Sequence, residues 1–385
     1  MVSTTAVMES QFTEQFREFL KAETDAGLRK LREDAFAIFS QLGFPTVKDE
    51  DWKYTNVAPI AKEKWVVTPF RPDFSPSGEK SGERLGKFNC RRSGFAALNL
   101  AFANFEVIHI AKDTSVEKPI ELSFAADENT VIFPHVLVIA EAGSKATIIE
   151  TYASQTKSFT NAAVQIIVED NANLTHYRVQ KESADAFHIG TTEVALGAGS
   201  RYDSTNINLG SAISRHGIDL KFTSEGGEAF VDGLYMLNGS QHSDTHSVID
   251  HMVPNCISHQ TYKGVLNDNS RAVFNGKVFV RENAHGTDAQ QSNKNLLLSN
   301  EARVDTKPQL EIFNDDVKCS HGATVGQLEE EELFYLLTRG LPDTLARNLL
   351  TYGFAEEIIN KIGIESIKKD LDAAVLNRLN TKLEG

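Results

Sequence analysis

Helical spacing of apolar residues opens the chain. Within residues 9–42, apolar side chains recur every three or four positions, which is the spacing of two amphipathic helices. Gly43 stands where a helix commonly ends, and Pro45 cannot continue one. Residues 66–96 are rich in Pro, Gly, Ser and charge and predict a long irregular connection. Residues 1–97 are therefore expected to form an N-terminal helical domain with an irregular connection.

The pattern changes over residues 98–325 to short apolar strands between polar turns. A turn followed by a small or apolar residue recurs about every 28 residues and then less regularly. The final residues of these units are Ala146, Leu174, Tyr202, Ala229, Ala272 and Arg303. A near-constant period of this size is typical of a solenoid, whose coils share one core. Residues 136–140 are continuously apolar, as in parallel strands covered on both faces.

This pattern predicts a mainly β fold with a parallel β-helix over residues 98–325. A β-sandwich with irregular loops is the alternative. The left-handed hexapeptide type of β-helix is disfavoured because no six-residue repeat is visible. No long helices separate the strands, so layered βαβ folds do not fit.

Residues 326–385 return to a helical pattern. Glu329–Glu332 would occupy a first helical turn, where negative charge is favourable. The predicted apolar stripe consists of Leu333, Leu336, Leu337, Leu345 and Leu349. These short amphipathic helices form an expected C-terminal helical domain that needs a partner surface, either the end of the solenoid or another protein.

Composition limits the function. The chain has 385 residues and a net charge of -14, which disfavours nucleic acid as a partner. It has no apolar run of membrane-spanning length, so no membrane association is expected. The segment Met1–Gln11 lacks the apolar core of a signal peptide. Three widely spaced cysteines suggest free thiols in a reducing compartment, and the expected location is the cytoplasm.

The candidate chemistry centres on Cys319 and His321, at the junction between the strands and the helical tail. On a strand, residues two apart share a face, and both side chains can bind soft transition metals. The alternative is a buried cysteine beside a hydrogen-bonded histidine.

A second cluster of possible ligands lies within residues 242–259. It contains His242, Asp244, His246, Asp250, His251, Cys256 and His259. Their spacing matches no standard ligand set, so stacked polar side chains on a solenoid turn are the favoured interpretation. The phosphate-binding loop, Cys-x-x-Cys, His-Glu-x-x-His and Gly-x-Ser-x-Gly motifs are absent from the sequence, and the protein is expected not to be an enzyme.

Several separated motifs resemble the SufB/SufD family of the SUF iron–sulfur cluster assembly system. They are residues 44–55, 262–266, 274–278, 287–289, 295–299, 318–326 and 334–340. The resemblance covers nearly the whole chain in the family's order. It implies a right-handed parallel β-helix with helical ends.

The resemblance also implies a protein complex of SufB, SufC and SufD in iron acquisition and cluster assembly. SufC, an ATPase, would bind the C-terminal helices in residues 327–385, and SufB would meet SufD through the β-helix ends. A transient iron–sulfur cluster or iron would be shared with SufB, with His321 as the matched ligand and Cys319 beside it. A homodimer of the isolated chain and a flavin in the complex are left open.

Two positions favour the SufD branch over the SufB branch. Asn293 stands near the place of the SufB cysteine, and Gly322 stands where SufB has Glu. His285 and Gly286 depart from the usual Gln-Lys of the SufD branch. The expected function is a non-enzymatic scaffold. The alternatives are a β-helix carbohydrate-active enzyme and a metal-free structural homo-oligomer.

Overall fold

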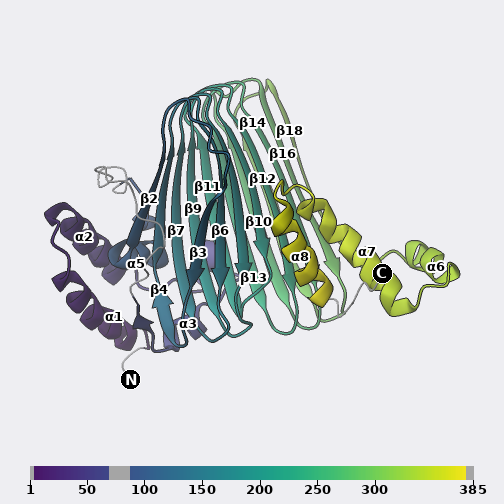
Figure 1. Cartoon of the computed structure of the whole chain (residues 1–385), viewed down its shortest axis with the longest axis horizontal. Coiled ribbons are helices and arrows are strands. Elements are labelled where there is room, and N and C mark those ends of the chain that lie inside the picture. The colour runs from purple at the N-terminus through teal and green to yellow at the C-terminus, as the bar shows by residue number, and fades with distance from the viewer. Residues whose placement is uncertain (1–3, 69–86, 379–385) are drawn as a thin grey trace.

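The computed structural model describes residues 4–68 and 87–378. A stack of coils forms its centre, and two sheets run through the stack (Figure 1). N-terminal helices lie at one end of the stack, and C-terminal helices lie toward the other end. The irregular connection predicted within residues 66–96 falls largely on residues 69–86, which lie outside the described residues.

The ten-stranded sheet and the eight-stranded sheet contain only parallel pairs within the described chain. The ten-stranded sheet comprises β1 (Val66–Val67), β2 (Asn104–Ile110), β4 (Thr130–Ile132), β5 (Pro134–Ala140), β7 (Phe159–Val168), β9 (Phe187–Leu196), β11 (Ile213–Phe222), β13 (His242–His251), β15 (Arg271–Val280) and β17 (Arg303–Ile312). The eight-stranded sheet comprises β3 (Ile120–Ala125), β6 (Lys145–Ala153), β8 (Asn173–Lys181), β10 (Arg201–Asn208), β12 (Glu228–Leu237), β14 (Ile257–Leu266), β16 (Thr287–Leu297) and β18 (Val317–Gly326). Consecutive strands alternate between the sheets from β5 onward, which confirms the predicted parallel β-helix.

The sequence repeat corresponds to a column of inward-facing side chains, but only in part. Ala146, Leu174, Tyr202 and Ala229 pair in register across the eight-stranded sheet. The column then continues through Ser258 and Ala289 to Cys319. The two later repeat positions, Ala272 and Arg303, lie on β15 and β17 of the other sheet. Each coil has two similar turn–strand units, so the repeat alone does not distinguish the sheets.

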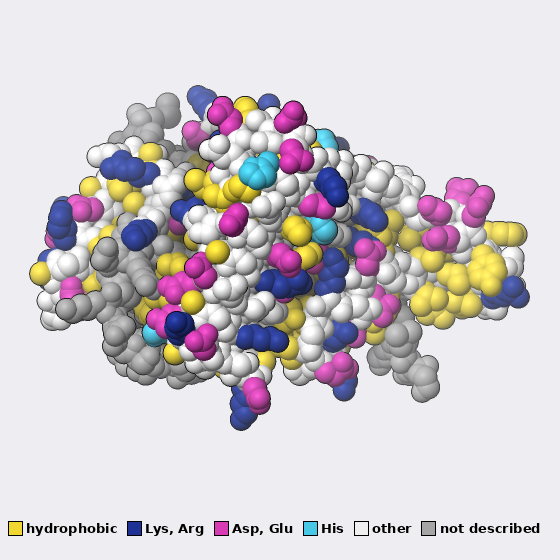
Figure 2. All heavy atoms as spheres, turned by 90° about the horizontal axis from the view of Figure 1, so that it is seen from above, with side chains coloured by type: hydrophobic (Ala, Val, Ile, Leu, Met, Phe, Trp, Pro, Cys, Tyr) yellow, Lys and Arg dark blue, Asp and Glu magenta, His cyan; other side chains and the backbone are white. Residues whose placement is uncertain are grey.

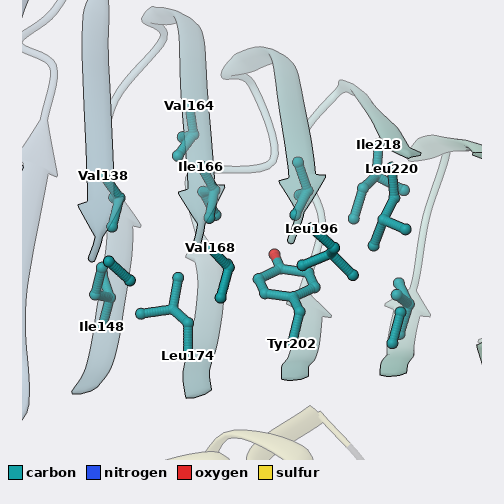
Figure 3. Close-up of a cluster of buried hydrophobic side chains, with 14 of the residues drawn as sticks. Val138, Ile148, Val164, Ile166, Val168, Leu174, Leu196, Tyr202, Ile218 and Leu220 are labelled. Carbon is teal, nitrogen blue, oxygen red and sulfur yellow. The ribbon is translucent and has the colours of Figure 1, made fainter. Parts of the chain in front are cut away.

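One side of the solenoid interior is apolar. Val164, Ile166 and Val168 of β7 point toward residues such as Leu174 and Tyr202 of the opposite sheet (Figure 3). Their side chains are almost completely buried. Burial of this shared apolar surface holds the two sheets together, because a single coil has too little surface to form a core.

The other side of the interior is polar and charged. His176 Nε2 lies 3.2 Å from Glu150 Oε1, and His188 Nδ1 lies 2.9 Å from Glu182 Oε2. Arg178 donates to Asn206 and contacts His188. Such groups can be buried only when opposite charges and hydrogen bonds compensate for lost hydration. The interior is thus filled by a paired polar network along one side.

The N-terminal helices cover the outer face of the ten-stranded sheet. They are α1 (Thr4–Lys21), α2 (Ala26–Leu42), the 3₁₀ turn η1 (Glu50–Trp52), α3 (Ala58–Lys62), the 3₁₀ turn η2 (Cys90–Arg92) and α5 (Gly94–Phe102). Gly43 ends α2 with a φ of 61°, as predicted. Every residue of α5 is buried, and Asn99 donates hydrogen bonds to the main chain of Pro134 and Asn161.

The C-terminal helices α6 (Glu330–Thr338), α7 (Asp343–Ile359) and α8 (Glu365–Arg378) include a pair that packs on the eight-stranded sheet. Ile358 of α7 and Leu371 of α8 join an apolar cluster with Ile207 and Leu234 on that sheet. Lys263, which is 3% exposed, bonds the main-chain oxygen of Phe354 and the carboxylate of Glu357. None of the helices in the described ranges combines the length and hydrophobicity of a membrane span.

Buried Glu106 on β2 should make the stability of the fold depend on pH. Its side chain is buried, and neither carboxylate oxygen has a hydrogen-bond partner among the described residues. Burial, together with nearby Glu150, raises its pKa from 4.5 to about 7. The folded chain therefore holds a proton that the unfolded chain releases, and stability falls as pH rises through this window. Glu106→Gln should stabilise the fold by about 1–3 kcal/mol above pH 7 and have little effect below pH 4.5.

Urea unfolding across this pH range measures the effect. Glu121→Gln on the exposed face of β3 is the matched control and should leave the pH dependence unchanged. Equal stabilisation of the Glu106→Gln protein at both ends of the range would contradict the assigned pKa.

Candidate functional site

Cys319 and His321 both lie on β18, the last strand of the eight-stranded sheet. Their register partners on β16 are Ala289 and Gln291, two buried inward-facing residues. The predicted shared face is therefore confirmed, and it is the interior face of the solenoid. Cys319 packs against the apolar core, whereas His321 is exposed.

His321 is exposed because, in the part of the chain that the structure describes, no further coil follows β18 at this end of the solenoid. Within the described residues, β17 and β18 each pair with one neighbouring strand, so the strand of His321 is an edge of its sheet. Three apolar side chains near this end remain 40–55% exposed: Ile312, Phe313 and Val325. An edge with free main-chain groups and exposed apolar side chains is suited to the addition of another strand.

The thiol and the imidazole differ in their environment. Burial, and then the nearby Asp288 carboxylate, raise the pKa of the Cys319 thiol, although a main-chain contact at Ala289 opposes this. The thiolate is the form that binds metals, so Cys319 must lose a proton on ligation. A neutral His321 imidazole already carries a ligand lone pair. His321 is therefore the readier ligand of the two in the free chain.

Within residues 4–68 and 87–378, no group of three or more His, Cys, Asp and Glu side chains is arranged to hold a metal ion. Iron in Fe–S clusters commonly has four ligands, sulfide included. Cys319 and His321 can supply two of the positions in such a set.

Asn293, near the position of the SufB cysteine, belongs to a buried polar network on β16. Its amide nitrogen donates to Tyr235 Oη at 3.1 Å, and its oxygen accepts from Asn295 and Thr306 at 2.7 and 2.8 Å. The residue is completely buried. Asn293 therefore links β16 to β12, which lies beyond β14 in the same sheet, and to β17.

The seven candidate ligands within residues 242–259 do not all lie together. His242, Asp244 and His246 share the outer face of β13, whereas His251 faces inward and bonds Ser258. His259 lies on a different sheet, where its Nε2 is 3.5 Å from Asp288. The interpretation as stacked polar side chains holds for the β13 group, which has a structural task.

That task is to bind the loop that follows α2. Thr55 donates to Asp244 Oδ2 at 2.5 Å and contacts His242 Nε2 at 2.8 Å. Arg215 pairs with Asp244 and lies 4.0 Å from the Trp52 ring centroid. Burial alone would raise the pKa of Asp244, but Arg215, His246 and Thr55 lower it well below its ordinary value. The sequence motif containing Trp52 and Thr55 thus anchors the N-terminal region to β13.

A second exposed apolar surface lies on the C-terminal helices. We call it the α6 patch, and Figure 2 shows hydrophobic side chains gathered at that end of the molecule. Its members are Phe334, Tyr335, Leu337 and Leu349, which are 37–68% exposed. Of the predicted stripe, Leu333 is instead buried. Sequence reasoning missed Phe334 and Tyr335 as surface residues, although their place outside the leucine stripe was a usable signal.

All three cysteines, Cys90, Cys256 and Cys319, are described and occur as free thiols. Cys256 is buried and its thiol faces the main-chain oxygens of Ser224 and Pro254. Burial raises the pKa of Cys90 and Cys256. Cys90 lies in η2 and Cys256 lies just before β14, so neither is on β18 with Cys319, and both are interpreted as structural thiols.

Comparison with known proteins identifies matching families. Residues 123–354 match the family described as "SUF system FeS cluster assembly, SufBD core domain", and residues 7–81 match the "SufBD protein N-terminal region". An iron–sulfur cluster assembly SufBD family protein of Synechocystis is 39% identical, with 91% of each chain covered. SufD of Escherichia coli is 33% identical over 88% of this chain and 90% of its own. SufD of Bacillus subtilis is 29% identical over 72% and 65%, respectively.

Thr55→Val tests the anchoring of the N-terminal loop. The substitution keeps the side-chain shape but removes a hydrogen bond to the buried Asp244 carboxylate. The free energy of unfolding should fall by about 1–3 kcal/mol, as measured by urea titration. Lys53→Ala, at an exposed position in the same loop, should change it by less than about 0.5 kcal/mol. Equal effects of both changes would show that the Thr55–Asp244 contact contributes little.

Proposed function

The chain belongs to the SufBD family of the SUF system for iron–sulfur cluster assembly, and from this premise we propose that it is a non-enzymatic scaffold subunit of the SufD type. It acts in a reducing cytoplasm with a SufB-type partner and the ATPase SufC. It takes part in iron acquisition and cluster assembly at its junction with SufB. The observation that carries this proposal is a metal-binding pair on the uncovered last strand of the solenoid.

The uncovered end is the surface for SufB. A partner of the same fold brings matching edge strands, and its pairing with β17 or β18 satisfies free main-chain groups. The partner also covers exposed Ile312, Phe313 and Val325. A second copy of the same chain offers the same edges, so a homodimer of the isolated protein competes with the SufB pairing.

Iron or a nascent cluster is the cargo at this junction. His321 supplies one ligand, Cys319 is available beside it, and SufB and sulfide supply the others. A neutral imidazole binds iron without first losing a proton, and it is a weaker ligand than a second thiolate. This combination suits a cluster that must be passed on.

The α6 patch is the surface for SufC. Its apolar side chains stand beside acidic Glu330–Glu332 at the start of α6, so the surface combines an apolar centre with negative charge. Apolar centres with polar rims are typical of protein interfaces. α7 and α8 meanwhile fix this surface to the solenoid through the cluster of Ile207, Ile358 and Leu371.

His321→Ala tests the ligand assignment. The side chain is exposed at the solenoid end, so its removal should cost less than about 0.5 kcal/mol of stability. In a strain that depends on the SUF system, growth should fall sharply, while the complex with SufB and SufC still co-purifies. Cys319→Ala should have a milder effect, because the neutral thiol is the poorer ligand.

Ser320→Ala, an exposed neighbour on the other face of β18, is the matched control and should grow normally. Normal growth with His321→Ala would refute the ligand role. Loss of the complex would instead assign His321 to assembly.

Phe334→Ser combined with Tyr335→Ser tests the SufC surface. Deleting residues 327–385 is a poorer test, because it would also uncover the apolar residues beneath α7 and α8. The double substitution should weaken SufC binding at least tenfold in a titration and leave the unfolding temperature unchanged. Met252→Ser, at an exposed apolar position elsewhere, is the control. Undiminished SufC binding by the double variant would move the SufC site off α6.

A further inference from the structure

Two columns of inward-facing positions, one on each sheet, run through the last three coils, and one of them ends at His321. On the eight-stranded sheet the column is Gln260, Gln291 and His321, which pair in register on β14, β16 and β18. On the ten-stranded sheet the corresponding column is Ser247, Gly276 and Pro308, on β13, β15 and β17. The last three coils can therefore be compared at one position.

In the first of these three coils, Gln260 has a hydrogen-bond partner on the opposite sheet. Ser247 Oγ donates to Gln260 Oε1 at 2.5 Å. Both residues are buried. The contact shows that a glutamine in this column reaches the opposite sheet when that sheet offers a hydroxyl.

One coil higher the hydroxyl is replaced by glycine. The Gln291 side chain is 3% exposed, and neither its Oε1 nor its Nε2 has a hydrogen-bond partner within the described residues. A Cβ atom on Gly276 would lie 2.3 Å from Gln291 Nε2, so the amide occupies the space that the glycine leaves. Burying an unpaired amide is costly, which makes a nearby polar group the natural partner.

His321 is the polar side chain that follows Gln291 in the column. Neighbouring strands are about 4.8 Å apart, so a modest tilt of either side chain brings the imidazole within hydrogen-bond distance of the amide. Pro308, which faces this coil from the other sheet, has an apolar side chain and does not compete for the amide. The Gln291 amide therefore fills the space beside Gly276, and His321 is the polar side chain next to it in register on β18.

We propose that Gln291 is a positioning residue for His321. Gln291 Oε1 accepts the N–H of the neutral imidazole and holds the ring in one tautomer, so that the other ring nitrogen presents its lone pair at the open end. Metal-binding histidines commonly have such an acceptor behind them, and it fixes both ring orientation and tautomer. The value of this arrangement for iron rests on the proposed function, whereas the proposed contact involves residues of this chain alone.

The tautomer of His321 provides a direct test. In the full-length chain labelled with ¹⁵N-histidine, long-range ¹H–¹⁵N spectra at mildly alkaline pH distinguish the two neutral forms, and the His321→Asn protein identifies the signal. One tautomer should dominate in the unmodified chain. Gln291→Leu keeps the volume but removes the acceptor, and the ratio of the tautomers should fall by about fivefold.

Two further variants separate positioning from simple packing. Gln260→Leu, one coil lower, should leave the His321 tautomer unchanged. Gly276→Ser rebuilds the pairing seen between Ser247 and Gln260, so it should capture the Gln291 amide and reduce the His321 preference while Gln291 is still present. The proposal is overturned if the unmodified chain shows no preferred tautomer, or if neither Gln291→Leu nor Gly276→Ser changes it.

Complementation of the SUF-dependent strain separates this inference from the proposed function. If Gln291→Leu changes the tautomer but His321→Ala grows normally, the contact stands and the ligand role of His321 fails. If His321→Ala stops growth while the tautomer is the same with and without Gln291, the positioning role fails. Gln291→Leu should slow growth without lowering the unfolding temperature, because it removes unpaired polar atoms from the interior.

Discussion

Within the described chain, the parallel hydrogen-bond ladder joins each interior coil to one neighbour on either side, whereas β17 and β18 at one end, like β2 and β3 at the other, have a neighbour on one side only. Inside the stack, inward side chains are covered from above and below, which is why groups such as Glu150 and Arg178 can be held in fixed pairs. In the last coil, side chains at these inward positions are covered from one side only and are open to solvent on the other. His321 therefore aligns in register with buried interior residues, although its own side chain is exposed to solvent.

The helices at both termini cover the outer faces of the two sheets and leave the last coil uncovered. The N-terminal helices and the loop bearing Thr55 cover the outer face of the ten-stranded sheet, and α7 and α8 cover part of the eight-stranded sheet. Buried Lys263 adds a polar attachment to α7 within that apolar contact. With these faces covered, the last coil and the α6 patch remain as apolar surfaces for other proteins.

The sequence could predict those features that depend on local pattern. Alternating strands, the repeat through Ala229 and the shared face of Cys319 and His321 all follow from residue spacing. The later repeat positions fall on the other sheet because the turns that precede the strands of the two sheets look alike. The partnership of Thr55 with Asp244, and the placing of Gln291 beside Gly276, join distant segments through side chains. No spacing rule contains that information, since it arises only when coils are stacked in register.

The edge position of β18 also has a consequence for local stability. Opening an interior strand breaks hydrogen bonds on two sides, but opening β18 breaks them on one, so β18 should fray more readily than the interior strands of its sheet. Amide protons of β18 would then exchange with solvent faster than those of β16 in the isolated chain. A protein that pairs with this edge converts the last coil into an interior coil. Binding of this partner would slow amide exchange along β18. The strand that carries His321 would therefore become fully rigid only within the assembled complex.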